Sequence, residues 1–515
     1  MSLTEKYSYK IKTADELKKI IGSFPRAQKV IMCHGVFDVV HPGHLRHLLF
    51  AKEKAHTLIA SITSDKFITK GRYRPHVPQE LRALNLAALE MVDYVIIDNN
   101  PEPLNNLKLL RPDFFDKGYE YSSHGKDSKT RNESDILESY GGKIIFTPGD
   151  IIYSSTALIN ADPPSLGVDK VLTLMEKEKI KFRDLKETLK NLSKSTVHVI
   201  GDTIVDSYTH TSIYGGQNKT PTPSVRYENK KDYVGGAGIV SKHIKATGAK
   251  VIFSTVLGDD QYKEFVLEDL KKTKVESNAI IDSTRPTTNK NVIIAANHRI
   301  AKIDTLDNNA ISDTILDQLV KATTNTKCDA VIFSDFRHGI FNKRSIKKLI
   351  NAIPKKIYKV ADSQVATRWG NILDFPGFDL ITPNEKEARF SLGDQDSGIR
   401  PLAADLYDAS KCKTLILKLG PKGVLVCRSS NHEDLNSFFI VESFTENAID
   451  PVGAGDAMLA YATLSMLVTK SASISAILGS LAAACECEFN GNIPVFPKNV
   501  LEKIKEIEKQ AKYGG

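Results

Sequence analysis

The sequence has few cysteines and no long apolar run. Its six cysteines are scattered over 515 residues. The close pair Cys485 and Cys487 has one intervening residue, whereas common zinc and redox motifs have two. We therefore expect reduced, mostly buried thiols. No apolar run approaches the roughly 18 residues that span a bilayer, and the N-terminal MSLTEKYSYKIK lacks the apolar core of a signal peptide. Together these absences predict a cytoplasmic protein that does not bind membranes.

The excess of positive charge is also small. Lys and Arg number 70 against 62 Asp and Glu, a formal charge of +8 spread over the whole chain. Such a surplus does not favour a nucleic-acid partner, but it suits phosphorylated small molecules. Hydrophobic residues at 41% and charged residues at 26% exclude a disordered or collagenous chain. The length allows two to four domains with real cores.

Two series of strand-like and helix-like segments divide the chain. Short apolar runs such as KVIMCHGVFD, TLIASITSD, DYVIID and KIIFT alternate with helical patterns, which predicts a parallel sheet wound with helices over residues 1–160. A lysine-rich stretch over 161–195 is predicted to be a partly helical linker. A second and larger αβ series fills 196–515. The fold class is therefore α/β in both domains. Near the start, Thr13 and Glu16 have the spacing of a capping box.

The string MCHGVFDVVHPGHLRHL carries the first candidate site. It places His41 and His44 in a turn between a strand and a helix, with Gly43 between them. Such a turn exposes backbone N–H groups and the positive end of a helix dipole, which suit an anion. The two imidazoles can then stabilise negative charge during phosphoryl or nucleotidyl transfer. The alternative is two surface histidines beside a tight turn.

This string resembles the HxGH nucleotidyltransferase superfamily, and the resemblance continues through SDKFITKGRYRP, ELRALNLAALEMVDYV, FDKGYEY and YSSTALI. It implies a Rossmann-like domain in which His41 and His44 stabilise the transition state at the α-phosphate of a nucleoside triphosphate. The same resemblance assigns nucleotide or phosphate binding to Gly35, Phe37, Lys70, Arg74, Arg82, Lys117, Gly118, Ser154, Ser155 and Thr156. The alternatives are surface charge for the basic residues and helix capping for the hydroxyl run. For Asp38, a place near the site and a structural turn role are equally open.

The string DPVGAGDA carries the second candidate site. Gly453, Ala454 and Gly455 precede Asp456 at the start of a helix rich in small residues. A glycine-bounded helix N-terminus offers free N–H groups to a developing phosphoryl charge, and an aspartate there can deprotonate a hydroxyl nucleophile. The alternative is an aspartate that only caps the helix.

DPVGAGDA resembles the signature of the ribokinase, or PfkB, sugar kinases, with proline after Asp450 where threonine is commoner. The order of VIGDTIVDSY, YVGGAGIVSKHIKATGA, TPNEKEA and LKLGPKGV extends the resemblance from Thr196 to Lys512. It implies a ribokinase-like domain with Asp456 as the general base and a small β lid over 209–230 and 287–305. The nucleotide side is implied to be Asn384, Glu387, Lys418, Gly420, Gly423, Gly453, Ala454 and Gly455. The sugar side is implied to be Asp202, Asp206, Gly235, Gly236, Lys290 and Asp304.

Further implications concern the metal and the assembly. The resemblance places Mg²⁺ near Glu387, bound directly or through water. Asn297 falls in the segment on the sugar side. Asp335 and Asp362 either belong to the site or merely end strands. Related kinases often pair through their lids, so a homodimer or higher homo-oligomer is expected.

The pairing of the two domains suggests consecutive reactions. A kinase makes a sugar 1-phosphate, and a nucleotidyltransferase converts it into a nucleotide sugar. This pairing resembles the bifunctional heptose 7-phosphate kinase and heptose 1-phosphate adenylyltransferase enzymes, which use ATP and Mg²⁺ to make ADP-heptose, but the domain order here is swapped. One alternative is a cytidylyltransferase with a kinase for another sugar or polyol phosphate. Another is a binding or regulatory protein with one degenerate domain.

Overall fold

The computed structural model describes residues 6–68, 75–118, 128–147, 167–213, 224–296, 298–365, 370–434, 436–445, 448–489 and 491–513. The chain forms two compact units, which are described separately. Unit 1 comprises Met1–Leu166 with the short segment Asp396–Leu402. Unit 2 comprises Gly167–Gln395 and Ala403–Gly515.

Unit 1 is built on a sheet whose strands are β1 (Val30–Gly35), β2 (Thr57–Thr63), β3 (Tyr94–Asp98), β4 (Phe114–Gly118) and β5 (Lys143–Thr147). The strands are all parallel, in the order β3-β2-β1-β4-β5. Its helices are η1 (Ser8–Lys10), α2 (Ala14–Ile21), α3 (Pro42–Lys54), η2 (Asp65–Phe67), α4 (Gln79–Ala87), α5 (Leu104–Leu110) and α6 (Ser128–Glu138). This arrangement confirms the parallel sheet predicted for the first domain.

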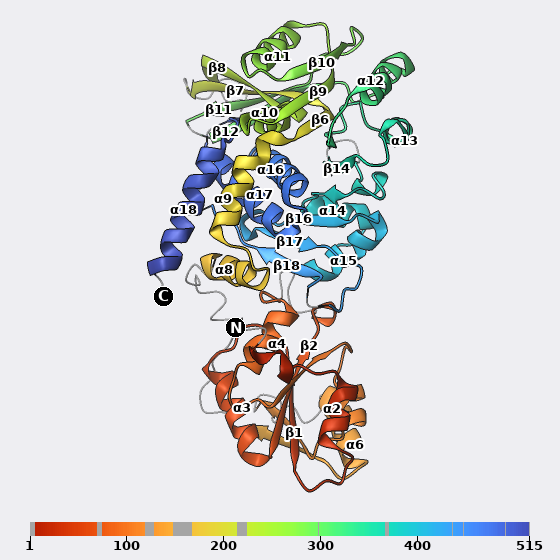
Figure 1. The fold of residues 1–515 in the computed structure, drawn as a ribbon, viewed down its shortest axis with the longest axis vertical. Helices are drawn as coiled ribbons and strands as arrows, with labels where there is room; N and C mark the ends of the chain where they lie inside the picture. The colour runs from red at the N-terminus through yellow and green to blue at the C-terminus, as the bar shows by residue number, and fades with distance from the viewer. Residues whose placement is uncertain are drawn as a thin grey trace. The chain divides into compact units, whose positions relative to one another are not determined.

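Helices cover both faces of this sheet, which explains why its strands read as continuous apolar runs. In Figure 1, α3 lies on one side of the strands and α2 and α6 lie on the other. Leu48 of α3 packs in one core cluster with Ile31 of β1, and Leu17 of α2 packs in the other with Met32. The predicted capping box is present, because Thr13 Oγ1 accepts the Glu16 N–H and the Glu16 carboxylate accepts the Thr13 N–H.

Unit 2 is built on a larger sheet whose strands are β6 (Thr196–Gly201), β9 (Lys250–Leu257), β10 (Glu276–Ile281), β13 (Ala330–Asp335), β14 (Tyr358–Ser363), β15 (Leu380–Ile381), β16 (Thr414–Lys418), β17 (Val424–Cys427) and β18 (Phe438–Val441). Their order is β10-β9-β6-β13-β14-β15-β16-β17-β18. The strands from β10 to β16 run parallel, and β17 and β18 complete the edge as antiparallel strands.

The helices of unit 2 surround this sheet. They are α8 (Gly167–Lys177), α9 (Phe182–Asn191), η4 (Leu192–Lys194), α10 (Ala237–Ala246), α11 (Gln261–Lys272), α12 (Asp313–Asn325), α13 (Lys343–Ala352), η5 (Ile372–Asp374), α14 (Glu385–Leu392), α15 (Ile399–Ser410, whose residues from Ala403 onward belong to unit 2), η6 (Gly420–Lys422), α16 (Ala454–Thr469), α17 (Ala472–Cys487) and α18 (Pro497–Tyr513). The two apolar helices α16 and α17 pack in the core with α10.

A second, smaller sheet in unit 2 corresponds to the predicted lid. Its strands are β7 (Thr203–Ile213), β8 (Val225–Gly236), β11 (Asn289–Ala295) and β12 (His298–Thr305). Their order is β12-β11-β7-β8, with β7 and β11 parallel and the outer pairs antiparallel. All eight residues of β12 are exposed. The two segments expected to form a lid therefore belong to one sheet.

The segment predicted as a linker, 161–195, divides in the structure. Residues 161–166 lie outside the described residues, while α8 and α9 belong to unit 2. Leu185 and Leu189 of α9 are buried in its main core cluster. The lysines that suggested a linker cover the outer face of amphipathic helices, so these two helices are part of the second domain.

Two expectations from composition can be compared with the structure. The six cysteines are free, and five of them are buried. None of the helices that the structure describes has the length and apolar character that crossing a membrane requires.

Candidate active sites

The first candidate site lies at the start of α3. His41 is the N-cap residue, and its Nδ1 accepts the Gly43 N–H at 3.1 Å. The rings of His41 and His44 stack with centroids 3.9 Å apart and an angle of 27° between their planes. The structure therefore brings the two imidazoles together at the N-terminus of a helix, where the helix dipole favours an anion.

Burial favours the neutral form of both imidazoles. It lowers the pKa of His41, and together with the neighbouring His41 and His47 it lowers the pKa of His44 to about 4. A neutral imidazole donates one N–H and accepts at its other nitrogen. The pair can therefore donate hydrogen bonds to phosphate oxygens without first being protonated, and two stacked imidazolium rings would repel each other.

Gly35 and Phe37 form the support behind His44. Phe37 has a positive φ of 49°, and its ring lies 5.0 Å from the His44 ring. A Cβ atom at Gly35 would lie 3.3 Å from the Phe37 ring, so glycine leaves room for this turn. Both residues therefore shape the loop that presents the histidines.

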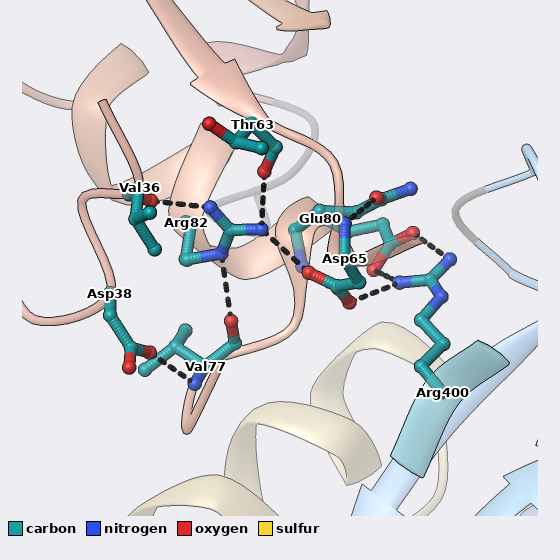
Figure 2. A network of polar contacts seen from close by, with 9 residues as sticks. Val36, Asp38, Thr63, Asp65, Val77, Glu80, Arg82 and Arg400 are labelled. Atoms are coloured by element: carbon teal, nitrogen blue, oxygen red, sulfur yellow. Dashed lines mark hydrogen bonds and ion pairs between the residues drawn. The ribbon is translucent and has the colours of Figure 1, made fainter. Parts of the chain in front are cut away.

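Arg82 has a different position from the one its predicted role requires. Figure 2 shows its guanidinium group surrounded by protein acceptors: the carbonyl oxygens of Val36, Thr63 and Val77 and the carboxylate of Asp65. The side chain is 0% exposed. Arg82 therefore holds together the loops beneath the site, and we replace the expected phosphate contact with this structural role.

Asp38 lies in the same network (Figure 2). Its Oδ1 accepts the Val77 N–H at 2.9 Å. This contact joins the loop before α3 to the segment before α4, which favours the structural alternative for Asp38. Its Oδ2 is buried and has no hydrogen-bond partner among the described residues.

The remaining predicted residues of unit 1 divide into two groups. Lys117 and Gly118 end β4, and the Lys117 ammonium group pairs with Glu133 and donates to Thr130 at 3.0 Å. In this conformation Lys117 is held by α6. Five of the predicted residues lie outside the described residues: Lys70, Arg74, Ser154, Ser155 and Thr156.

The second candidate site lies at the start of α16. Gly453 is the N-cap residue with a φ of 88°, a conformation that favours glycine. A Cβ atom there would lie 2.9 Å from Glu486 Oε1 and 3.0 Å from Asn492 Oδ1. Ala454 and Gly455 form the first turn, followed by Asp456. The predicted glycine-bounded helix N-terminus is therefore present.

Asp456 lies among other charged side chains. Its pKa is raised to about 8, chiefly by burial and then by Asp362, against the opposing effect of Lys418. Lys418 donates to Asp362 Oδ1 at 2.9 Å. A Cβ atom at Gly455 would lie 3.3 Å from Lys418 Nζ, so the glycine allows the ammonium group to approach the helix. At neutral pH the Asp456 carboxyl group is thus a weak acid and, once deprotonated, a correspondingly strong base.

Asn384 and Glu387 cap α14 and face the same region. The Asn384 N–H donates to Glu387 Oε2 at 2.6 Å, and Asn384 Oδ1 accepts the Glu387 N–H at 2.9 Å. Asn384 also forms an isolated bridge with Lys418 at the end of β16. Burial, and secondarily Asp362, raises the pKa of Glu387 to about 7 against the effect of Lys418. The two predicted residues therefore lie beside the Lys418 pair.

Gly420 and Gly423 form the turn between β16 and β17. Their φ angles are 60° and 84°, and the Gly423 N–H donates to the Gly420 carbonyl oxygen at 3.0 Å. A Cβ atom at Gly423 would lie 2.1 Å from the Val441 carbonyl oxygen. Glycine is thus required by the tight turn and the close backbone approach.

The predicted sugar side is built on the lid strands. Strand register places Lys290 of β11 beside Asp206 of β7 and Asp304 of β12. Asp206 accepts Asn492 Nδ2 at 2.6 Å, and a Cβ atom at Gly235 would overlap its carboxylate at 2.0 Å. Burial raises the pKa of Asp206 and lowers that of Lys290. Asn297 lies outside the described residues.

Asp202 has mainly structural contacts. Its carboxylate accepts the N–H groups of Phe336, His338 and Ile340 at 3.0, 3.2 and 3.4 Å. Gly236 is the last residue of β8 and has a φ of 59°, and a Cβ atom there would lie 2.5 Å from the Asp202 carbonyl oxygen. These two residues therefore fix the junction of lid and main sheet.

Asp335 and Asp362 do more than end strands. Asp335 accepts the Ser363 hydroxyl and the Arg337 N–H, and its pKa is raised to about 7 by burial. Asp362 pairs with Lys418 beside Asp456 and accepts the Thr382 hydroxyl. Asp362 is therefore brought into the site, whereas Asp335 belongs to a neighbouring buried network.

Comparison with known proteins gives the family. Residues 194–499 match the pfkB family carbohydrate kinase. This match covers more than half of the 515 residues. The chain belongs to the pfkB family. Residues 32–161 match a second family, described as cytidylyltransferase-like. The predicted order, with the nucleotidyltransferase-like domain before the pfkB domain, is confirmed.

Curated relatives of this chain include several proteins named Bifunctional protein HldE. The Bifunctional protein HldE of Rhodopseudomonas palustris (strain BisB5) is 27% identical over 326 residues, covering 61% of this chain and 64% of the relative. The Bifunctional protein HldE of Geobacter metallireducens is 36% identical over 138 residues, covering 26% of this chain and 27% of the relative. The chain thus spans about 64% of the length of the first of these relatives.

Solved structures agree on the fold of the pfkB domain. Escherichia coli phosphofructokinase-2 in complex with substrates and products is 18% identical, with a TM-score of 0.51, covering 61% of this chain and 99% of that one. The tetrameric inhibited form of the same enzyme gives a TM-score of 0.50 at 17% identity. At these identities the likeness concerns the fold alone.

The sequence analysis did not identify Glu486 and Asn492, which lie next to Gly453 at the start of α16. Glu486 is buried in α17, and burial raises its pKa to about 8. Asn492 joins this site to the lid through Asp206. An acidic residue inside the otherwise apolar, alanine-rich α17 was the available signal for Glu486. No local pattern marks Asn492, whose partner is 286 residues away.

Proposed function

We propose that the chain is a bifunctional enzyme of nucleotide-sugar biosynthesis. The pfkB domain phosphorylates a sugar resembling heptose 7-phosphate at its C1 hydroxyl with ATP. The cytidylyltransferase-like domain then transfers AMP from ATP to the sugar 1-phosphate and releases pyrophosphate, which gives a product resembling ADP-heptose. The named HldE relatives, matched over part of their length, support this pairing.

In the kinase reaction, Asp456 takes the proton from the sugar hydroxyl while its oxygen attacks the γ-phosphorus of ATP. A bond forms between that oxygen and phosphorus, and the bond to the β-phosphate oxygen breaks, so ADP leaves. The raised pKa of about 8 fits a general base that must accept a proton during the reaction. The N–H groups at the start of α16 hold the charge that develops on the phosphoryl oxygens.

The donor set of this site fits Mg²⁺, which prefers oxygen ligands and keeps several waters. Glu387 is the candidate ligand, directly or through water, because a carboxylate retains lone pairs beyond the one that accepts the Asn384 N–H. Its raised pKa reflects a buried carboxyl group whose charge a cation would stabilise. When bound, Mg²⁺ neutralises charge on the nucleotide phosphates.

In the second reaction, an oxygen of the sugar 1-phosphate attacks the α-phosphorus of the nucleoside triphosphate, and the bond to pyrophosphate breaks. His41 and His44 donate hydrogen bonds to the oxygens that gain charge. Their neutral state, which burial produces, removes any need for a protonation step at neutral pH.

The observation that supports the proposal is that two helix starts, one in each unit, carry side chains of different chemistry. One presents the stacked pair His41 and His44. The other presents Asp456, whose pKa is about 8, near the Lys418–Asp362 pair. A stabilising donor pair suits nucleotidyl transfer, and a base suits phosphorylation of a hydroxyl group.

A second candidate function has a specific observation in its favour. The match of residues 32–161 to a cytidylyltransferase-like family supports CTP as the nucleotide of the first domain, with another sugar or polyol phosphate as acceptor. Sugar phosphates and nucleoside triphosphates are the partners in both cases. The homo-oligomer and the cytoplasmic location stay predictions.

The test is a product screen by mass spectrometry. The full chain is incubated with candidate sugar phosphates, Mg²⁺ and either ATP or CTP. We expect a sugar 1-phosphate and then a nucleotide sugar with ATP. His41→Ala should accumulate the sugar 1-phosphate, and Asp456→Asn should convert only a supplied sugar 1-phosphate. A nucleotide sugar formed with CTP alone would favour the second candidate, and tight nucleotide binding without any turnover would refute both.

A further inference from the structure

One group of Cys, His and acidic side chains in the described part of the chain has the spacing of a metal site. It consists of Cys33, His47 and Asp116, whose possible ligand atoms all lie within 4.8 Å of one another. The group lies in unit 1, on the face of the sheet that α3 covers. The reactions proposed above make no use of these side chains.

The fold brings the three residues together by strand register. Cys33 of β1 and Asp116 of β4 are direct partners in the parallel pairing, so both side chains point to the same face. His47 lies three positions after His44 on α3 and therefore faces the same way as that histidine. Its Nδ1 lies 3.4 Å from Asp116 Oδ2.

The group is buried, and one of its oxygen atoms has no hydrogen-bond partner among the described residues. Asp116 is 1% exposed and Cys33 is 0% exposed. The Thr147 hydroxyl donates to Asp116 Oδ2 at 2.8 Å and also lies in hydrogen-bond contact with His47 Nδ1 at 2.6 Å. Asp116 Oδ1 is buried without a hydrogen-bond partner among the described residues. Burial raises the pKa of Asp116 to about 7 and raises that of Cys33 as well. An unpartnered carboxylate oxygen beside a thiol is unfavourable unless the carboxyl group takes up a proton or a cation binds there.

The distances suit a small ion. Bonds of about 2.0–2.3 Å in a tetrahedral zinc site space the ligand atoms about 3.3–3.8 Å apart. The pair His47 Nδ1 and Asp116 Oδ2 already has this spacing. Since no pair in the group exceeds 4.8 Å, closing around an ion requires side-chain movements under about 1.5 Å.

We propose that Cys33, His47 and Asp116 bind a divalent transition-metal ion of the zinc class. A thiolate and an imidazole select such an ion over Mg²⁺, which prefers oxygen ligands alone. Binding releases the Cys33 thiol proton and any proton on Asp116. The His47 ring then carries its proton on Nε2, so that Nδ1 exchanges its contact with the Thr147 hydroxyl for the ion. Thr147, which hydrogen-bonds Asp116, holds the carboxylate in place as an outer partner. The ion joins α3 to β1 and β4 one turn after His44 and so fixes the helix that presents the catalytic pair.

The test measures metal directly in the full chain. The protein is purified without a metal-bearing resin, dialysed against a chelator and reloaded with Zn²⁺ alone. Elemental analysis should find about one ion per chain. Reloading with Co²⁺ instead should produce the charge-transfer absorption of a thiolate–cobalt bond. Cys33→Ser should remove this absorption and weaken Zn²⁺ binding by about tenfold or more.

Cys412→Ser is the matched control, because Cys412 is also a buried free thiol but lies in unit 2. It should keep both the ion and the cobalt absorption. Asp116→Asn, which preserves the side-chain shape, should keep the absorption but bind Zn²⁺ more weakly, and it serves if Cys33→Ser does not fold. Less than about a tenth of an ion per chain in the wild type, or unchanged absorption in Cys33→Ser, would overturn the proposal.

Discussion

At the start of α3 in unit 1, the side chains beside the helix amides are the imidazoles of His41 and His44, whereas at the start of α16 in unit 2 the side chain is the carboxyl group of Asp456. Burial acts on both, but in opposite directions on the pKa: it lowers that of His44 to about 4 and raises that of Asp456 to about 8. In each case burial disfavours the charged form. An imidazole that is kept neutral becomes a ready donor, while a carboxyl group made less acidic becomes a stronger base.

The largest difference between the two sites is expected when the general base of unit 2 is removed. Asp456→Asn keeps the size of the side chain but cannot accept the hydroxyl proton. We expect ATP-dependent phosphorylation to fall by about 10³–10⁴-fold, while nucleotidyl transfer to a supplied sugar 1-phosphate stays unchanged. The two rates are measured as ADP and pyrophosphate release. Equal loss of both activities would contradict two independent sites.

Removing one donor in unit 1 should have a smaller effect. His44→Ala leaves His41 as the remaining imidazole, so we expect pyrophosphate release to fall by about 10²–10³-fold with phosphorylation unchanged. The wild-type rate should also stay level between about pH 6 and pH 8, because an imidazole with a pKa of about 4 is neutral throughout this range. A rate that falls as the pH rises through about 6.5 would show that an imidazolium is required.

The pH dependence of phosphorylation sharpens the contrast. Because the Asp456 carboxyl group has a pKa of about 8 and acts when deprotonated, activity should be lost as the pH falls below this value. We expect kcat/KM for the sugar to rise about tenfold from pH 7 to pH 9, since kcat/KM reports the free enzyme. Initial rates in overlapping buffers at constant ionic strength measure this. A level profile over the same range would exclude Asp456 as the titrating base.

The smallest expected effect is on the local stability of helix α2 in unit 1. Thr13→Ala removes one half of the capping box of α2, which should cost about 1 kcal/mol of local stability. Hydrogen exchange of the amides in α2 should accelerate about fivefold, while amides of α16 should not change. Thr13→Ser is the control and should restore most of the protection. Equal exchange in Thr13→Ala and the wild type would show that the cap contributes nothing.

Local patterns predicted the parts of the fold that depend on neighbours in sequence. Thr13 and Glu16 cap α2 as their spacing indicated, and the helix that carries Asp456 begins at Ala454 as the glycines indicated. Short-range hydrogen bonding and side-chain periodicity determine these helix starts, so they can be predicted without a structure. The lid segments were implied by the resemblance to the sugar kinases, and the structure joins them through the long-range pairing of β7 with β11.

Contacts between distant residues could not be predicted in the same way. Cys33 and Asp116 meet only because β1 and β4 are neighbours in one register. Arg82 belongs to a helix whose sequence suggested an accessible cation, but its acceptors come from loops that the fold brings around it. A sequence pattern shows which chemical groups are present at a position. Long-range packing determines whether such a group contacts the substrate or other parts of the protein.

The side chains around Lys418 have a consequence for measured binding heats. One ammonium group lies near three carboxyl groups, and two of these, Glu387 and Asp456, have pKa values of about 7 and 8. Near neutral pH these two carboxyl groups are therefore partly protonated in the ligand-free kinase site. Binding of a nucleotide changes their average protonation. A metal-free nucleotide should draw protons from the buffer and a metal-bound one should expel them, so that calorimetry in two buffers of different ionisation enthalpy would give two different heats for the same equilibrium.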